Sequence, residues 1–137
     1  MFRKLLRQLH IFLYRLTGGR VGGGMGGFNV LLLNSLGRKS GETRTNAVGY
    51  FVDGANFIVI ASNFGAGPHP AWYHNLKANP NTTIQVKSQL IKVKAETANP
   101  TERQRLWAEL MKIAPSYADL EKKVNRELPV VILHPLG

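Results

Sequence analysis

The sequence of 137 residues contains no cysteine. This absence excludes disulfides, thiolate nucleophiles, and zinc or iron–sulfur sites built on cysteine. Long apolar runs are also absent, because no stretch approaches the roughly 18–20 residues that span a bilayer. The basic N-terminus is not followed by a small-residue cleavage site, so we expect no signal peptide and a cytoplasmic protein.

Acidic residues are scarce, with 8 Asp and Glu against 18 Lys and Arg, and residues 1–41 contain none. The few acids are scattered, so no pair of them is typical of a general acid and base. A net charge of +10 suits an anionic partner: nucleic acid, an anionic membrane surface or a multiply charged small ligand. Single-strand binders interleave their cations with aromatic stacking platforms, and this chain does not, so we expect no nucleic acid. A merely solvated basic face is the plainer interpretation.

The chain divides near residue 28. Residues 2–16 show apolar side chains at spacings of three and four with cations opposite, which predicts an amphipathic helix. A Gly-rich hinge follows, so residues 1–27 form one unit and residues 28–137 form a domain with its own core. The helix pattern suits either a cover for the domain or peripheral contact of residues 1–20 with the anionic inner face of the membrane.

Alternating and continuous apolar runs predict six strands in the second unit. Asp53-Gly54 marks the turn of the first hairpin, and Asn99-Pro100-x-Glu102 is typical of a capped helix start. Strands linked mainly by hairpins favour a small closed or nearly closed antiparallel barrel, a mixed α+β fold that is mainly β with short inserted helices. The expected strands are 28–35, a hairpin within 43–62, a hairpin within 82–97, and 129–133; the expected helices lie within 69–80, after Asn99, and after a break and cap at Pro115-Ser116.

Two local patterns are set aside. Gly22-x-Gly24-x-x-Gly27 satisfies the dinucleotide fingerprint, but here a helix precedes and a strand follows, which is the inverse of the required order. His69 and His74 are five residues apart, a spacing that does not bring two imidazoles onto one helical face, and no carboxylate neighbours them. We therefore expect no metal site. Without a nucleophile–base arrangement, the sequence indicates a cofactor that carries the chemistry.

Three ordered blocks carry a family resemblance: LLLNSLGRKSGETRTN, FIVIASNFGAGPHPAWYHNLKANP and PSYADLEKKVNRELPVVIL. Together they resemble the deazaflavin-dependent nitroreductase family, from about Val30 to Leu133. The resemblance implies a split β-barrel related to flavin-nucleotide-binding barrels. It further implies coenzyme F420 as cofactor and hydride transfer to an electron-poor acceptor: a quinone, an enone or a nitroaromatic. The alternatives are a split barrel that binds flavin mononucleotide or heme, and a non-enzymatic basic surface module for membrane or nucleic acid.

The resemblance assigns roles to residues of the first two blocks. Coenzyme F420 has a phosphodiester and a glutamate chain, and cationic side chains with turn amides suit such a tail. The second block holds the deazaflavin ring, with Phe64 narrowing the pocket. The residues implied for the tail are Arg38, Lys39, Ser40, Gly41, Arg44 and Asn46; those implied for the ring are Ala61, Ser62, Asn63, Gly65, Ala66, Pro70, Ala71 and Trp72.

The third block bears on the acceptor. Nitroimidazole-reducing relatives carry tyrosines in this short helix, and the resemblance makes Tyr117 the candidate proton donor. A second tyrosine of those relatives is replaced here by Leu120. This departure makes a quinone or another conjugated carbonyl compound at least as suitable as a nitro compound.

Overall fold

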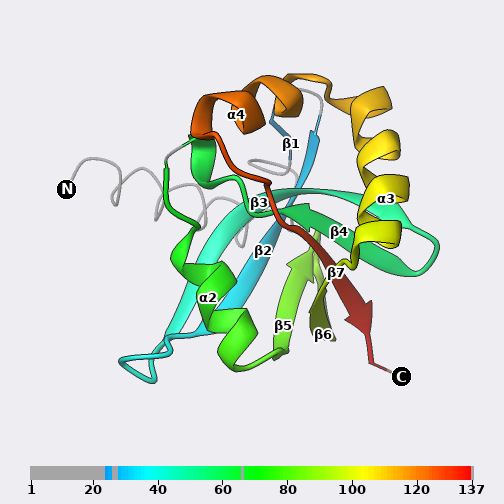
Figure 1. The fold of residues 1–137 in the computed structure, drawn as a ribbon. Helices are drawn as coiled ribbons and strands as arrows, with labels where there is room; N and C mark the ends of the chain where they lie inside the picture. The colour runs from blue at the N-terminus through cyan, green and yellow to red at the C-terminus, as the bar shows by residue number, and fades with distance from the viewer. Residues whose placement is uncertain (1–23, 26–27, 66, 137) are drawn as a thin grey trace.

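Seven strands, three α-helices and one short 3-10 helix make up the part of the chain that the computed structural model describes, residues 24–25, 28–65 and 67–136 (Figure 1). The predicted helix over residues 2–16 lies outside this part, as does most of the predicted Gly-rich hinge. The elements are β1 (Gly24–Met25), β2 (Phe28–Leu36), β3 (Thr43–Asp53), β4 (Asn56–Ile60), η1 (Asn63–Gly65), α2 (Ala71–Ala78), β5 (Asn81–Val86), β6 (Gln89–Thr97), α3 (Pro100–Ile113), α4 (Ser116–Val124) and β7 (Val130–Pro135).

The predicted antiparallel barrel is confirmed. The sheet runs in the order β1-β2-β3-β4-β7-β6-β5, and an additional pairing of β2 with β5 closes six of these strands into a ring. This closure joins Leu32 to Gln85 and Leu33 to Ile84. The predicted hairpin turns also form, with Gly54 at φ 60° in the first and Lys87 at φ 55° in the second.

The Gly-rich stretch differs from the prediction at one place. We expected it to be too rich in glycine for strand or helix, yet Gly24 and Met25 form β1 and pair with Asn29 and Phe28 of β2. Two residues suffice because strand pairing uses backbone groups, which glycine also carries.

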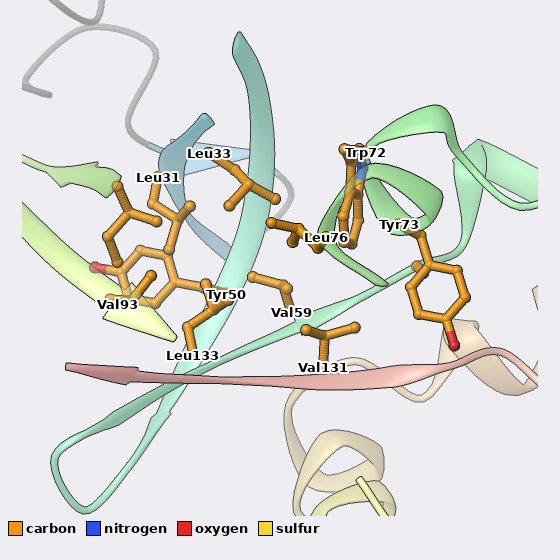
Figure 2. Close-up of a cluster of buried hydrophobic side chains, with 12 residues drawn as sticks. Leu31, Leu33, Tyr50, Val59, Trp72, Tyr73, Leu76, Val93, Val131 and Leu133 are labelled. Carbon is orange, nitrogen blue, oxygen red and sulfur yellow. The ribbon is translucent and has the colours of Figure 1, made fainter. Parts of the chain in front are cut away.

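The barrel interior is filled by inward-facing side chains of the strands, together with the helix α2 (Figure 2). Leu31 and Leu33 of β2 face this interior, while Val30 and Leu32 between them point to the other side and form a separate buried cluster, so both faces of this strand are covered. Trp72, Tyr73 and Leu76 project from α2 into the same cluster, so this helix closes one end of the barrel. Each such large side chain contributes roughly 1.5–3 kcal/mol on burial. α2 is therefore held firmly against the end of β2.

A second cluster covers the outer face of β4 and β7. Ile58 and Ile60 of β4 pack there against Leu106 and Leu110 of α3, while Tyr117 and Leu120 of α4 pack at its margin. The predicted cap of α3 is confirmed, because the Asn99 side chain accepts a hydrogen bond from the Glu102 amide at 2.8 Å.

The start of α4 differs from its prediction. Ser116 is the first helical residue, and the capping position is Pro115, which makes no side-chain cap hydrogen bond. Pro115 already has helical backbone angles, φ −62° and ψ −16°, so the chain turns into the helix one residue earlier than the serine suggested.

β3 is longer than its partner β4, so part of one edge of β3 has no partner in β4. β4 pairs only with Tyr50–Asp53, while β2 pairs with β3 from Thr43 to Tyr50. The stretch Thr43–Gly49 therefore has a strand on one edge and, within the described residues, none on the other. Such an edge presents backbone N–H and C=O groups to whatever lies beside it.

Candidate active site along the free edge of β3

A cleft of about 740 Å³ lies along this free edge. Its floor is β3 itself, and its walls come from the β2–β3 turn, the segment after β4, α2 and α4. The lining residues within the described part of the chain are Val30, Gly37–Ser40, Arg44–Gly49, Ile60, Ser62, Asn63, Pro70–Trp72, Asn75, Tyr117 and Leu120.

One end of the cleft is cationic. Arg38 and Lys39 lie in the β2–β3 turn and Arg44 lies at the start of β3; all three are exposed and line the cleft. The three predicted cations are thus brought together. Arg44 is 3.5 Å from the carboxylate of Glu42, an exposed pair that contributes little to stability and leaves Arg44 free to exchange partners.

The amides of the turn are not all available to a ligand. The Gly41 amide donates to the Gly37 carbonyl at 2.8 Å, and Gly41 does not line the cleft, contrary to the predicted donor role. Its φ of 72° explains the glycine instead, because L-residues rarely adopt this conformation. The amides of Lys39 and Ser40 have no partner within the described residues, so the free donors are shifted one residue toward the N-terminus.

The segment after β4 meets its prediction only in part. Ser62 and Asn63 line the cleft, and the Asn63 side-chain amide donates to the Pro68 carbonyl at 3.0 Å. Ala61 does not line it, because this residue is fully buried in the barrel interior and its amide donates to the Pro129 carbonyl at 2.9 Å. The Ala61 backbone donor is therefore not available to a ring.

Gly65 makes room for the protein rather than for a ligand. It has φ 80°, and a Cβ added to it would lie 2.9 Å from Cδ2 of Leu120. The glycine thus lets α4 pack against η1, and it does not line the cleft. Ala66 and the side chain of Phe64 lie outside the described residues, so their predicted roles stay predictions.

Trp72 belongs mainly to the core. Pro70, Ala71 and Trp72, which the resemblance assigns to the ring, all line the cleft. The Trp72 side chain, however, is only 6% exposed and packs among the interior side chains (Figure 2). It supports the cleft wall from behind and offers little surface to a ligand.

The end of the cleft formed by α4 carries apolar side chains and the hydroxyl of Tyr117. Tyr117 and Leu120 of α4 line it together with Ile60. Burial raises the pKa of Tyr117 above its ordinary value, so the phenol stays protonated at neutral pH. Leu120, which replaces the second tyrosine of the nitroimidazole-reducing relatives, has its side chain over Gly65.

α4 is fastened at two places. Arg103 of α3 lies 2.6 Å from the Glu121 carboxylate, and its guanidinium also stacks on Trp107 with 4.5 Å to the ring centroid. Arg126, just after the helix, donates to the carbonyls of Gly67 at 2.6 Å and Pro68 at 3.1 Å. These contacts fix the helix that carries Tyr117 relative to the segment between η1 and α2.

Several lining residues were not predicted from the sequence. Ala47 and Gly49 lie on one face of β3, opposite Leu32 and Val30 of β2. A glycine inside a strand indicates close approach of a ligand or another backbone, and this signal was present at Gly49. Asn75 had no comparable signal, because its partners lie 37 and 40 residues away.

His69 and His74 lie closer together than predicted. Their ring centroids are 5.7 Å apart, because His69 precedes α2 and the spacing rule for a helical face does not apply to it. Burial, with the charge of Arg126, lowers the pKa of His69. Within the described residues, no three His, Cys, Asp or Glu side chains form a group that could hold a metal ion.

Comparison with known proteins supplies the family. Residues 6–135 match the family model described as F420H(2)-dependent quinone reductase. The F420H(2)-dependent quinone reductase of Mycobacterium tuberculosis H37Rv is 36% identical over 132 residues, which cover 93% of this chain and 89% of that protein.

Solved structures agree with this result. An F420-H2-dependent reductase superposes with a TM-score of 0.69 at 29% identity, covering 77% of this chain and 93% of its own. A chain described as a domain-swapped dimer shares the fold alone, with a TM-score of 0.73 at 24% identity and coverage of 98% and 100%. The resemblance to deazaflavin-dependent nitroreductases is thereby narrowed: this chain belongs to the F420H(2)-dependent quinone reductase family.

Proposed function

We propose that the cleft holds coenzyme F420 along β3, with its anionic tail at the cationic end and its ring at the Tyr117 end, and that a quinone is the acceptor. Family membership makes the chain an F420H2-dependent oxidoreductase. The observation that carries the proposed orientation is the polarity of the cleft, from Arg44 at one end of its floor to Gly49 at the other. Five residues of strand span about 16 Å, so tail and ring contacts are well separated.

The residues present fit this cofactor. Arg38, Lys39 and Arg44 supply charge for phosphate and carboxylates, and the amides of Lys39 and Ser40 add free donors. At the other end, Gly49 lines the cleft without a side chain, which suits the close approach of a flat ring to the strand. The free edge of β3 offers backbone groups to the polar edge of such a ring.

When bound, reduced coenzyme F420 supplies a hydride. The protein aligns donor and acceptor and excludes water, for which the apolar surface of Ile60 and Leu120 is suited. A hydride gives a quinone two electrons and one proton, and a second proton completes the hydroquinone. The Tyr117 hydroxyl at this end is our candidate donor of that proton.

The test of the proposal is a pair of equilibrium titrations of the purified protein, followed by a steady-state screen of acceptors. We expect tight binding of coenzyme F420, weak binding of flavin mononucleotide and heme, and faster turnover with quinones than with enones or nitroaromatics. Preferential binding of flavin mononucleotide or heme would favour the alternative of a split barrel that serves those cofactors. A preference for nitroaromatics would contradict the acceptor assignment.

Gly49→Val should block the ring end of the cleft. Valine favours strands, so the barrel should stay as stable as the wild type, while its isopropyl group fills space that the proposed ring occupies. We expect coenzyme F420 affinity to fall about tenfold or more, and Gly49→Ala to give a smaller loss. Titration measures the affinity and thermal melting measures the stability of both variants. If a folded Gly49→Val variant keeps wild-type affinity, the ring does not bind at this surface.

We also propose peripheral membrane contact through residues 1–20, which carry five cations and an amphipathic pattern. The described residues include no helix of the length and hydropathy that membrane crossing requires. Contact of this kind would bring a lipid-soluble quinone near the cleft. Each cation close to an anionic surface adds on the order of 1 kcal/mol, decaying within a Debye length.

Deletion of residues 1–20 should therefore abolish salt-sensitive binding to vesicles that contain anionic lipid, while coenzyme F420 binding survives. Vesicle co-sedimentation measures the first property and titration the second. A variant with Arg3, Lys4 and Arg7 replaced by glutamine should lose most of the vesicle binding at full length. If the truncated protein instead loses its folded barrel, the segment belongs to the core and the membrane proposal fails.

A further inference from the structure

Ser35 and Asn75 are the only buried polar or charged side chains in the described part of the chain, with exposed fractions of 1% and 5%. Ser35 lies near the end of β2, and Asn75 lies in α2. Burying an amide costs free energy unless its donors and acceptors find partners. Asn75 meets this condition with two hydrogen bonds, one through each polar atom of its side chain.

The first bond reaches the cationic turn. Oδ1 of Asn75 accepts from the backbone amide of Arg38 at 3.1 Å. The second reaches the strand, because Nδ2 donates to Oγ of Ser35, also at 3.1 Å. The Asn75 side chain thus joins α2 to Ser35 at the end of β2 and to Arg38, the first charged residue of the turn.

The amides of this turn divide into two groups. Those of Gly37, Arg38, Gly41 and Glu42 all donate within the protein, and the Arg38 amide does so only to Asn75. Those of Lys39 and Ser40 have no partner within the described residues. Asn75 itself lines the cleft, as do Ala71 and Trp72 of the same helix.

We infer that Asn75 is a positioning residue for the cofactor's anionic tail. By holding the Arg38 amide it fixes the turn against α2, so that the cations and the two free amides stay at a set distance from the ring end of the cleft. This inference rests on the proposed function, since it assumes that the tail binds at this turn. It predicts a selective defect: losing Asn75 should harm tail binding and spare ring binding.

The test compares two probes, coenzyme F420 and the ribityl deazaflavin that lacks the anionic tail. Asn75→Leu keeps the branched shape and deletes both hydrogen bonds. We expect its coenzyme F420 affinity to fall about tenfold, its affinity for the tail-less probe to stay within about twofold, and the Arg38 amide to exchange faster with solvent. Ser35→Ala keeps the Asn75–Arg38 bond and should show a smaller loss, which preserves the test if Asn75→Leu folds poorly.

Tyr73→Phe is the matched control. It removes a hydrogen bond of the same helix, between the Tyr73 hydroxyl and Oγ1 of Thr97 at 3.3 Å, on a side that does not line the cleft. We expect a comparable loss of thermal stability with wild-type affinity for both probes.

Three results would overturn the inference: unchanged coenzyme F420 affinity in Asn75→Leu, equal losses for the two probes, or an unchanged Arg38 amide. If the wild type failed to bind coenzyme F420, the proposed function would fall, while the Arg38 exchange rate would still report whether Asn75 holds the turn.

Discussion

Replacing Arg38, Lys39 and Arg44 together by alanine should weaken coenzyme F420 binding by about 100-fold without unfolding the protein. All three side chains are exposed at the cationic end of the cleft. Charge-assisted contacts contribute roughly 1.5–3 kcal/mol when shielded and less when exposed, so we take about 1 kcal/mol for each. Among the described residues, the three replacements remove one side-chain ion pair, the exposed pair of Arg44 with Glu42, which should leave the thermal stability nearly unchanged.

Isothermal titration at two salt concentrations measures this effect. The wild type should bind more weakly at high salt, and the triple variant should have lost most of that salt dependence. A control variant with Lys92, Lys94 and Lys112 replaced by alanine removes the same charge from exposed positions that do not line the cleft. Equal losses in both variants would mean that net charge, rather than this turn, attracts the cofactor.

Tyr117→Phe should lower the turnover of quinones by about 100-fold, which is the expected size for the loss of a proton donor. The affinity for coenzyme F420 should change less than about twofold. The substitution keeps the ring that packs beside the outer apolar cluster. A stopped-flow measurement of hydride transfer, alongside titration, separates the rate from the affinity. An unchanged rate with several quinones would reduce Tyr117 to a packing residue.

The pH dependence of the rate gives a second check on Tyr117. Because burial raises its pKa above the ordinary value of about 10, the phenol should remain a donor throughout the neutral range, and the rate should fall only when pH rises beyond about 10. Tyr50→Phe is the matched control, since burial also raises the pKa of Tyr50 but its side chain lies inside the barrel. That variant should retain the wild-type rate.

Local patterns accounted for much of the fold. The hairpin turn at Gly54 and the cap at Asn99 depend on residues within four positions of each other, and both are present. Closure of the barrel between β2 and β5 joins residues about fifty positions apart, and only the general preference of hairpin-linked strands for barrels predicted it. The two-residue strand β1 had no side-chain pattern to indicate it.

The cationic end of the candidate site could be predicted, because three cations close together in a turn are visible in the sequence. The positions of Ala61 and Gly65 could not be predicted, because they depend on contacts with residues far along the chain. Whether Ala61 faces a ring or the barrel interior depends on the bond of its amide to Pro129, a residue far along the chain. Gly65 lies in a Gly-rich segment of the kind that often contacts a ligand, yet the group close to it is the side chain of Leu120.

The alternation of β3 has a consequence for how such a protein can change over generations. Tyr50 faces the barrel interior, Ala47 and Gly49 line the cleft, and Val48 borders both. An exchange at Gly49 alters the shape offered to a ligand without opening a void in the interior, and an exchange at Tyr50 need not alter the cleft. Selection on acceptor preference and selection on folding therefore act on different positions of one strand, with Val48 shared between them, which lets either property drift at the unshared positions while the other is maintained.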